Sequence, residues 1–132
     1  MKSISFHSDF IFVGRSKAYG RGVFTEKAIK VNTVIEIAPV IVMSPKDRKL
    51  IDETALHNYI FEWGNDCKEC CMALGFVPLY NHSYQSNCEY EMDYKKALIT
   101  IRTVRPVKAG EQLFINYIGE PQNETPVWFD TN

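Results

Sequence analysis

The sequence has no long hydrophobic run and no strong charge of either sign. Residues 1–10 lack the apolar stretch of a signal peptide, and no segment approaches the length of a membrane-spanning helix. Fifteen basic and sixteen acidic residues leave a formal net charge of -1, so the surface as a whole should attract neither nucleic acid nor an acidic membrane. We therefore expect a protein of a reducing compartment: the cytoplasm, the nucleus if the source is a eukaryote, or a host cell if it is a pathogen.

Cysteine is scarce, with only Cys67, Cys70, Cys71 and Cys88 in the chain. The first three are spaced like part of a zinc site, but a structural zinc ion takes four ligands and Cys88 stands alone in the sequence. We therefore predict no metal site, and interpret the four residues as free thiols, buried or partly exposed.

Long helical patterns are also absent. Runs rich in β-branched and aromatic residues instead predict short strands, at residues 10–13, 23–24, 33–43, 56–63, 70–74, 88–94, 97–103 and 113–115. One short helix is predicted from Pro45 to about Asp52, with Ser44 as its N-cap. Because strands do not alternate with long helices, the pattern disfavours a doubly wound nucleotide-binding sheet. With 45% apolar residues, it predicts one mostly-β globular domain over residues 1–132.

Three local features complete this outline. Residues 14–22 contain three glycines and several basic side chains, and are interpreted as a loop joining two strands or, less readily, as a phosphate cradle. Pro39 lacks a backbone donor, so its strand should lie at an edge there or break in two. Residues 88–103 should form a hairpin in which Ile99 and Ile101 face inward.

What the sequence does contain is a segment with an unusual mixture of side chains, at residues 76–90. It combines amides, an imidazole, hydroxyls and three tyrosines with apolar residues, which is too polar for a core strand and too aromatic for a solvated loop. Such a mixture indicates a site. Its histidine, His82, has no nucleophile arranged with it, so a hydrolase triad is unsupported, and a lone histidine is more often a hydrogen-bonded core residue.

Three motifs occur in a fixed order around this segment. The central motif is Asn81-His-Ser-Tyr-Gln-Ser-Asn87; Gly20-Arg-Gly22 precedes it and Gly110-Glu-Gln-Leu-Phe-Ile-Asn-Tyr117 follows it. Each motif alone is weak, but the ordered set, from about residue 12 to residue 117, resembles the SET-domain protein lysine methyltransferases. The resemblance implies a β-clip fold of small curled sheets, with few short helices and a knot-like C-terminal arrangement, followed by a tail at residues 118–132.

The resemblance also implies S-adenosyl-L-methionine as the cofactor. The positions that match the family's cofactor-binding residues are Gly20, Arg21, Gly22, Asn81 and His82, with Tyr59 as a further contact. Glycines admit a ligand close to the main chain, and an amide with an imidazole can satisfy polar groups of the adenine and the backbone. After Tyr117 there is no cysteine, so the zinc-binding tail of some members is absent; Trp128 is expected to cover the adenine instead, or else to be a surface-packed anchor.

Tyr117 matches the family's catalytic tyrosine, with a buried strand-closing tyrosine as the alternative. Methyl transfer is an in-line displacement, so the enzyme mainly needs a neutral amine held in line with the methyl carbon. A narrow aromatic channel orients the lysine and lowers its pKa by desolvation. Tyr90 matches a channel position at which a hydroxyl limits the space for added methyl groups, so we predict that mono-methylation is favoured.

The chain also departs from the family pattern. Tyr84 and Ser86 replace a familiar cysteine and proline, and residues 36–40 lack the aromatic that many members carry. Two other classes therefore stay open: a SET-type module that binds peptide or cofactor without turnover, and a structural β-domain. As partners we expect a lysine-containing protein or peptide, a histone tail or another lysine, with no direct nucleic-acid or membrane contact; a homodimer stays open.

Overall fold

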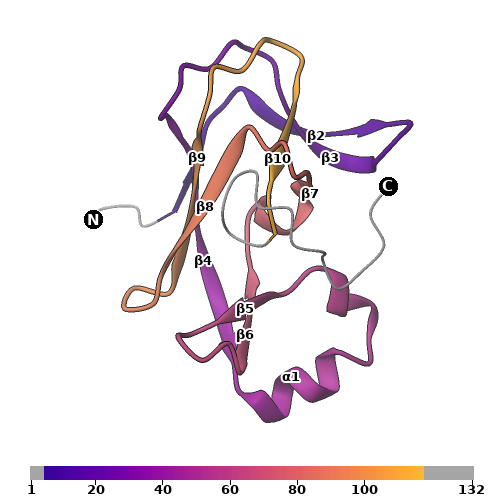
Figure 1. Cartoon of the computed structure of the whole chain (residues 1–132), viewed down its shortest axis with the longest axis vertical. Helices are drawn as coiled ribbons and strands as arrows, with labels where there is room; N and C mark the ends of the chain where they lie inside the picture. Colours follow the sequence, from indigo (N-terminus) through magenta and orange to yellow (C-terminus); the bar gives the residue numbers. More distant parts are fainter. Residues whose placement is uncertain (1–4, 118–132) are drawn as a thin grey trace.

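The computed structural model describes residues 5–117, and it is built almost entirely from short strands (Figure 1). The elements in chain order are β1 (Phe6–His7), β2 (Ile11–Ser16), β3 (Gly20–Thr25), β4 (Val34–Met43), α1 (Pro45–Ile51), the 3₁₀ turn η1 (Ala55–Asn58), β5 (Phe61–Trp63), β6 (Glu69–Ala73), the 3₁₀ turn η2 (Val77–Leu79), β7 (Asn81–His82), β8 (Cys88–Asp93), β9 (Leu98–Thr103) and β10 (Gln112–Ile115). The prediction of a mostly-β chain with few short helices is confirmed.

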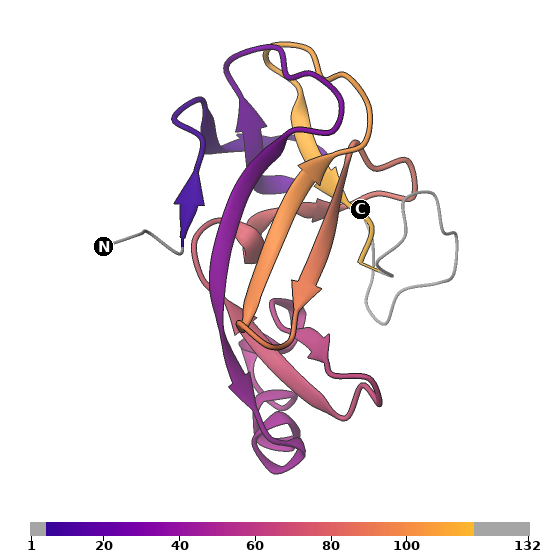
Figure 2. The ribbon, with the colours of Figure 1, turned by 90° about the vertical axis from the view of Figure 1, so that its left-hand side faces the viewer.

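The strands form two sheets. In the larger sheet the order is β5-β6-β4-β9-β8, with β1 beside β4, and Figure 2 shows β4, β9 and β8 curving side by side along the molecule. The smaller sheet has the order β2-β3-β10-β7. Its β10 and β7 pair in parallel, which places Phe114 opposite Asn81 and Ile115 opposite His82. The central motif and the last motif of the sequence therefore lie side by side. The knot-like C-terminal arrangement stays a prediction.

The remaining motif, Gly20-Arg-Gly22, lies in β3 of the same sheet. It belongs to a hairpin that the sequence did not predict. Residues 14–22 were expected to be a loop, but β2 and β3 pair without interruption from Ile11 opposite Thr25 to Ser16 opposite Gly20. The prediction was wrong because glycine was taken as a sign of irregular backbone. Here Gly20 closes the turn with a φ of +70°, and the other glycines lie within the paired strands.

Strand β4 is unbroken at Pro39, and the reason is a change of neighbour. On one side β4 pairs with β9 as far as Pro39 opposite Leu98. On its other side it pairs with β1 at Ile37 and with β6 only from Val40 onward. The residue without an N–H therefore lies in the gap between two partner strands, where no ladder donor is required.

The segment before β5 also differs from its prediction. A strand was expected over residues 56–63, but Ala55–Asn58 forms a 3₁₀ turn, with the Thr54 side chain accepting from the N–H of Leu56, and strand pairing begins only at Phe61. The hydroxyl cap outweighs the alternating pattern there. The helix prediction is confirmed: Ser44 caps α1, Pro45 occupies its first turn, and Asp52 follows its end.

The core lies between the two sheets. The β8–β9 hairpin is confirmed, and both Ile99 and Ile101 face inward with no exposed surface. Cys67 is exposed and the other three cysteines are buried free thiols; burial raises the pKa of the Cys88 thiol to about 12, which keeps it protonated and unreactive. Within residues 5–117 no helix has the length and apolar character needed to cross a membrane.

Candidate functional site

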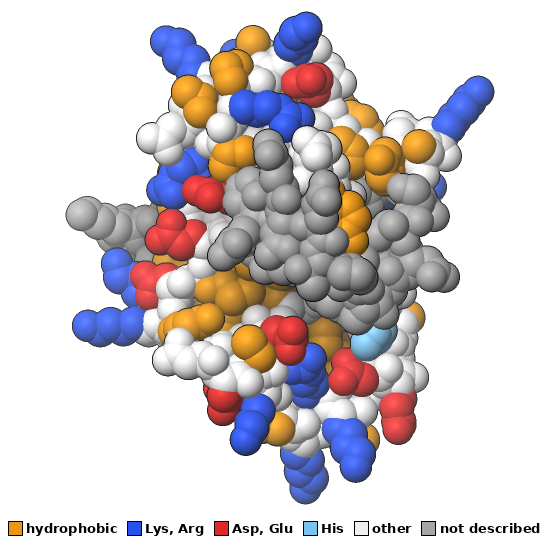
Figure 3. Space-filling view, viewed as in Figure 1, with side chains coloured by type: hydrophobic (Ala, Val, Ile, Leu, Met, Phe, Trp, Pro, Cys, Tyr) orange, Lys and Arg blue, Asp and Glu red, His pale blue; other side chains and the backbone are white. Residues whose placement is uncertain are grey.

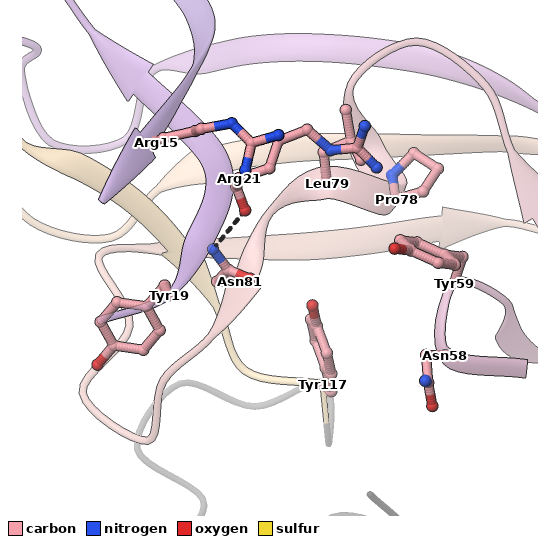
Figure 4. A pocket seen from close by; sticks show the side chains of 9 residues that line it. All are labelled: Arg15, Tyr19, Arg21, Asn58, Tyr59, Pro78, Leu79, Asn81 and Tyr117. Carbon is pink, nitrogen blue, oxygen red and sulfur yellow. Dashed lines mark hydrogen bonds between the residues drawn. The ribbon is translucent and has the colours of Figure 1, made fainter. Parts of the chain in front are cut away.

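A pocket of about 490 Å³ opens where η1, η2 and the β2–β3 hairpin meet. Its walls are Arg15, Tyr19, Arg21, Asn58, Tyr59, Pro78, Leu79, Asn81 and Tyr117. Figure 4 shows the two arginine side chains along one side of this space and the hydroxyls of Tyr59 and Tyr117 pointing into it. The pocket is therefore polar and cationic on one side, and aromatic on the other.

Asn81 is held in place through its amide nitrogen. That nitrogen donates to the backbone carbonyl of Arg21 at 2.9 Å (Figure 4). It also donates to Oε1 of Gln112 at 2.8 Å, so both of its hydrogens are bound. A Cβ atom on Gly22 would overlap the same amide and Gln112, so only glycine lets β3 come this close. The amide orientation is thus fixed, and Oδ1 remains as the group that can accept from a ligand.

His82 is buried beside Tyr117 and is held as the neutral imidazole. Its Nδ1 accepts a hydrogen bond of 3.1 Å from the backbone N–H of Tyr117, which places the ring proton on Nε2. Burial lowers the pKa of His82 below its ordinary value. Among the described residues Nε2 has no hydrogen-bond partner, although it is shielded from solvent. A buried donor without a partner is costly, although His82 is not among the residues that line the pocket.

Tyr117 has both of its polar ends bound. Its hydroxyl donates to the backbone carbonyl of Tyr80 at 2.5 Å, and its own carbonyl accepts from the Tyr90 hydroxyl at 3.1 Å. Burial raises the pKa of both Tyr117 and Tyr90, so neither hydroxyl ionises near neutral pH. Tyr117 is thus a neutral, oriented hydroxyl and not a strong base.

A narrower cavity adjoins the main pocket and is walled by aromatic and apolar side chains. It is lined by Asn58, Tyr59, Ile60, Phe61, Pro78 and Tyr117, four of which also line the main pocket. The Phe61 ring packs edge-on against Tyr90, with ring centroids 5.3 Å apart, and lies 6.3 Å from the Tyr117 ring. Tyr117 therefore stands where a polar pocket meets an aromatic channel.

The structure brings most of the predicted site residues together. Arg21, Tyr59, Asn81 and Tyr117 line the main pocket, and Gly20 and Gly22 lie in β3 beside it. His82 and Tyr90 do not line the pocket, but each forms a hydrogen bond with the backbone of Tyr117. Trp128 lies outside the described residues. Sequence reasoning missed five lining residues: Arg15, Tyr19, Asn58, Pro78 and Leu79. The two from β2 and its turn could have been found if residues 14–22 had been interpreted as a hairpin.

The two departures after His82 have distinct surroundings. The Tyr84 ring stands edge-on to His82, with centroids 4.5 Å apart and planes at 88°. Ser86 is buried, and its hydroxyl has no hydrogen-bond partner among the described residues. Asn87 holds the loop against β10 through two hydrogen bonds. Its side-chain nitrogen donates to the carbonyl of Gln112 at 2.9 Å, and its side-chain oxygen accepts from the N–H of Phe114 at 2.8 Å. The loop is therefore anchored despite the changed residues.

The face seen in Figure 3 carries both signs of charge. Blue and red side chains are interspersed among hydrophobic ones, and on the described part of this face neither sign forms a continuous patch. Several pairs are bound to each other, such as Arg48 with Glu62 at 3.2 Å and Arg102 with Glu91 at 3.3 Å. Inside the pocket the cationic side chains are those of Arg15 and Arg21.

Comparison with known proteins assigns this fold and these motifs to one family. The model of the SET domain matches residues 20–118, and the chain belongs to the SET-domain family. A Schizosaccharomyces pombe protein named as a histone-lysine N-methyltransferase specific for H3 lysine-37 is 32% identical over 99 residues, which cover 74% of this chain and 66% of that protein. The aligned part is therefore just under two thirds of that relative's own length.

Two solved structures share the fold. A Plasmodium falciparum protein, described as a candidate histone methyltransferase, superposes with a TM-score of 0.61 at 24% identity and covers 83% of this chain and 94% of its own. A humanised mutant of the Chaetomium thermophilum Polycomb Repressive Complex 2, bound to the inhibitor GSK126, gives a TM-score of 0.67 at 18% identity over 81% of this chain and 14% of that one. The expected SET-domain fold is confirmed.

Proposed function

We propose that the protein transfers a methyl group from S-adenosyl-L-methionine to the side-chain amine of a protein lysine. The observation that carries this proposal is the position of Tyr117, whose side chain lines both the polar pocket and the aromatic channel. A donor in one and an acceptor amine in the other would meet at that residue. The relative named as a histone-lysine N-methyltransferase supports the same reaction class.

The residues of the main pocket fit the cofactor. S-adenosyl-L-methionine carries a carboxylate, an ammonium group, an adenine and a sulfonium, and its positively charged sulfur activates the methyl group for displacement. The guanidinium groups of Arg15 and Arg21 suit the carboxylate, and the remaining oxygen of Asn81 suits a donor. The rings of Tyr19 and Tyr59 supply apolar faces, and His82 contributes by holding the backbone N–H of Tyr117.

The channel residues would prepare the amine. Phe61, Tyr59 and Tyr117 line the narrower cavity, and desolvation among such rings would lower the pKa of an entering lysine so that its neutral form becomes populated. Since the Tyr117 hydroxyl is bound to the carbonyl of Tyr80 and stays protonated, it orients the reacting groups through its oxygen and does not remove a proton. Alignment of donor and acceptor supplies the larger share of the rate.

Mono-methylation is the product that the channel favours. The Tyr90 hydroxyl is held against the carbonyl of Tyr117 at 3.1 Å, and the Tyr90 ring packs on Phe61. A fixed hydroxyl at this place restricts rotation of an amine that already bears a methyl group. The proposal therefore includes a slow second transfer.

A histone lysine is the first substrate to test, because the Schizosaccharomyces pombe relative is named for one. Other protein lysines, such as those of ribosomal proteins, belong in the same panel. A cytoplasmic or nuclear location is proposed with this substrate class. The alternative function is a SET-type module that binds cofactor or peptide without turnover, and it keeps Asn81 and His82 but does not require Tyr117.

The deciding experiment supplies the labelled methyl donor to the protein with histones, ribosomal proteins and cell lysate. Wild-type protein should label a lysine, and Tyr117→Phe should lose most of the activity while keeping cofactor affinity in a calorimetric titration. Lys68→Ala, which alters an exposed residue away from the pocket, is the matched control. Cofactor binding without any transfer would favour the binding module, and no cofactor binding would contradict the proposed function.

A further inference from the structure

A carboxylate is buried in the core behind the site. Glu36 of β4 is 1% exposed, although it lies among apolar residues of the larger sheet. Its Oε2 accepts from the backbone N–H of Phe76 at 2.7 Å, and its Oε1 accepts from the Tyr80 hydroxyl at 2.9 Å. Burial raises its pKa, which the two donors partly offset. The side chains of Glu36 and Tyr80 have no role in the function proposed above, in which only the backbone carbonyl of Tyr80 takes part.

Two hydrogen bonds through Tyr80 link Glu36 to Tyr117 in the pocket. Tyr80 is fully buried, and its side chain reaches Glu36 while its backbone carbonyl accepts the Tyr117 hydroxyl at 2.5 Å. One residue thus joins a carboxylate of the larger sheet to the hydroxyl at the junction of pocket and channel. Tyr80 also directly precedes Asn81 and closes the η2 turn, with its N–H directed at the carbonyl of Val77.

We propose that Glu36 is a positioning residue for methyl transfer: by binding the Tyr80 hydroxyl, it fixes the Tyr80 carbonyl on which Tyr117 is oriented. The inference rests on the proposed function and deepens it. Tyr117 has a hydroxyl that must point toward the reacting groups, and small displacements of such a group lower rates steeply. A rigid acceptor for that hydroxyl therefore contributes to the rate without touching substrate or cofactor.

Stability alone is a poor account of this pair. Apolar side chains of similar shape would fill the same space without the desolvation cost of a carboxylate, and replacing both partners of a buried hydrogen bond in this way can be nearly neutral or stabilising. The surroundings are nevertheless shaped to admit the carboxylate: Gly75 has a φ of +65°, and a Cβ atom there would overlap Oε2 of Glu36. Glu36 and Tyr80 are 44 residues apart in the sequence. Their hydrogen bond fixes the position of the Tyr80 side chain, which an apolar pair would not do.

The test removes only the bond between the two side chains. Tyr80→Phe keeps the ring and deletes the hydroxyl. Glu36→Gln keeps an isosteric side chain whose oxygen can accept from the N–H of Phe76 while its NH2 group donates to the oxygen of Tyr80. The matched control is Val107→Ala, a buried residue that pairs with Ile29 away from the pocket. For all variants, kcat and KM come from a titration of the peptide that wild type labels, at saturating cofactor, and the cofactor Kd comes from calorimetry, at a temperature well below the lowest Tm of the series.

We expect Tyr80→Phe to lower kcat at least fivefold, with the peptide KM and the cofactor Kd within twofold of wild type. Glu36→Gln should retain more of kcat than Tyr80→Phe does. Val107→Ala should lower Tm with no change in kcat. Equal kcat values for Tyr80→Phe and Val107→Ala would overturn the inference, because the pair would then act on stability alone.

A second measurement does not depend on turnover. With 3-fluorotyrosine at position 117, the ¹⁹F resonance should shift in Tyr80→Phe and stay unchanged in Val107→Ala. If wild-type protein transfers no methyl group, the proposed function fails, while a shifted resonance still shows that the bond between Glu36 and Tyr80 orients Tyr117. An unchanged resonance in Tyr80→Phe overturns that role whatever the activity.

Discussion

The backbone N–H of Tyr117 donates to Nδ1 of His82, so the end of β10 is held by an imidazole that must be neutral. A protonated ring would present a second donor to that N–H and break the bond. The last motif of the sequence is thus tied to the central motif through a titratable group, and not only through the parallel pairing of β10 with β7.

The first prediction concerns pH. Burial lowers the pKa of His82 in the folded protein, whereas the unfolded chain takes up this proton at about pH 6.5. The contribution of neutral His82 to the free energy of unfolding is therefore complete above about pH 6.5. It is lost as the pH falls from there toward the lower pKa of His82 in the folded protein. Urea denaturation should show the free energy of unfolding decreasing as pH falls from about 7 to about 5.5.

The control for this effect is His82→Asn, which keeps an acceptor for the Tyr117 N–H and removes the titration. Its free energy of unfolding should depend less steeply on pH over the same range than that of wild type. His57→Gln, which alters the exposed histidine bound to Asp52, should leave the decrease in place. Identical slopes for wild type and His82→Asn would exclude His82 as the cause.

The second prediction uses two glycines that face each other across the hairpin. Gly22 and Gly14 are paired in register, but a Cβ atom on Gly22 would overlap Asn81 and Gln112, whereas one on Gly14 would touch the partly exposed rings of Phe24 and Phe12. Overpacking costs about 1–3 kcal/mol. Gly22→Ala should therefore weaken cofactor binding at least tenfold by calorimetry, with Gly14→Ala within threefold of wild type. Equal affinities in the two variants would contradict the packing argument.

The third prediction concerns the number of methyl groups. Tyr90→Phe removes the hydroxyl that bonds the carbonyl of Tyr117, and so loosens the support behind Phe61 and Tyr117, which line the channel. Mass spectrometry should find mainly monomethyl-lysine with wild type and a larger share of dimethyl-lysine with Tyr90→Phe. Mainly trimethyl-lysine from wild-type protein would contradict the proposed preference for mono-methylation.

The fourth prediction concerns the loop after β7. Asn87 is 2% exposed and bonds two backbone groups of β10. Asn87→Ala leaves the N–H of Phe114 and the carbonyl of Gln112 buried without this partner, so the free energy of unfolding should drop by about 2–4 kcal/mol. Gln85→Ala, two residues earlier and exposed, should change it by less than about 0.5 kcal/mol in the same urea titration.

Much of this site was predictable because its residues are concentrated in short motifs. Asn81, His82 and Tyr117 were predicted together, and the pairing of β7 with β10 brings them together. Local patterning also predicted α1 and the β8–β9 hairpin, since caps and alternation act over a few residues.

What could not be predicted depends on contacts between distant residues. Arg15 and Tyr19 reach the pocket only because β2 and β3 pair, which the glycines concealed. The 3₁₀ turn before β5 depends on the Thr54 hydroxyl, which competes with an alternating pattern that predicts a strand. Glu36 and Tyr80 are 44 residues apart, and no sequence pattern links them.

The measurement closest to the central claim is a crystal structure of the protein with S-adenosylhomocysteine and a lysine peptide. The account predicts that the nucleoside product occupies the pocket beside Arg21 and Asn81, and that the lysine amine arrives through the channel of Tyr59 and Phe61 to meet it at Tyr117. A ligand bound elsewhere, or an amine that approaches without passing Tyr117, would contradict it.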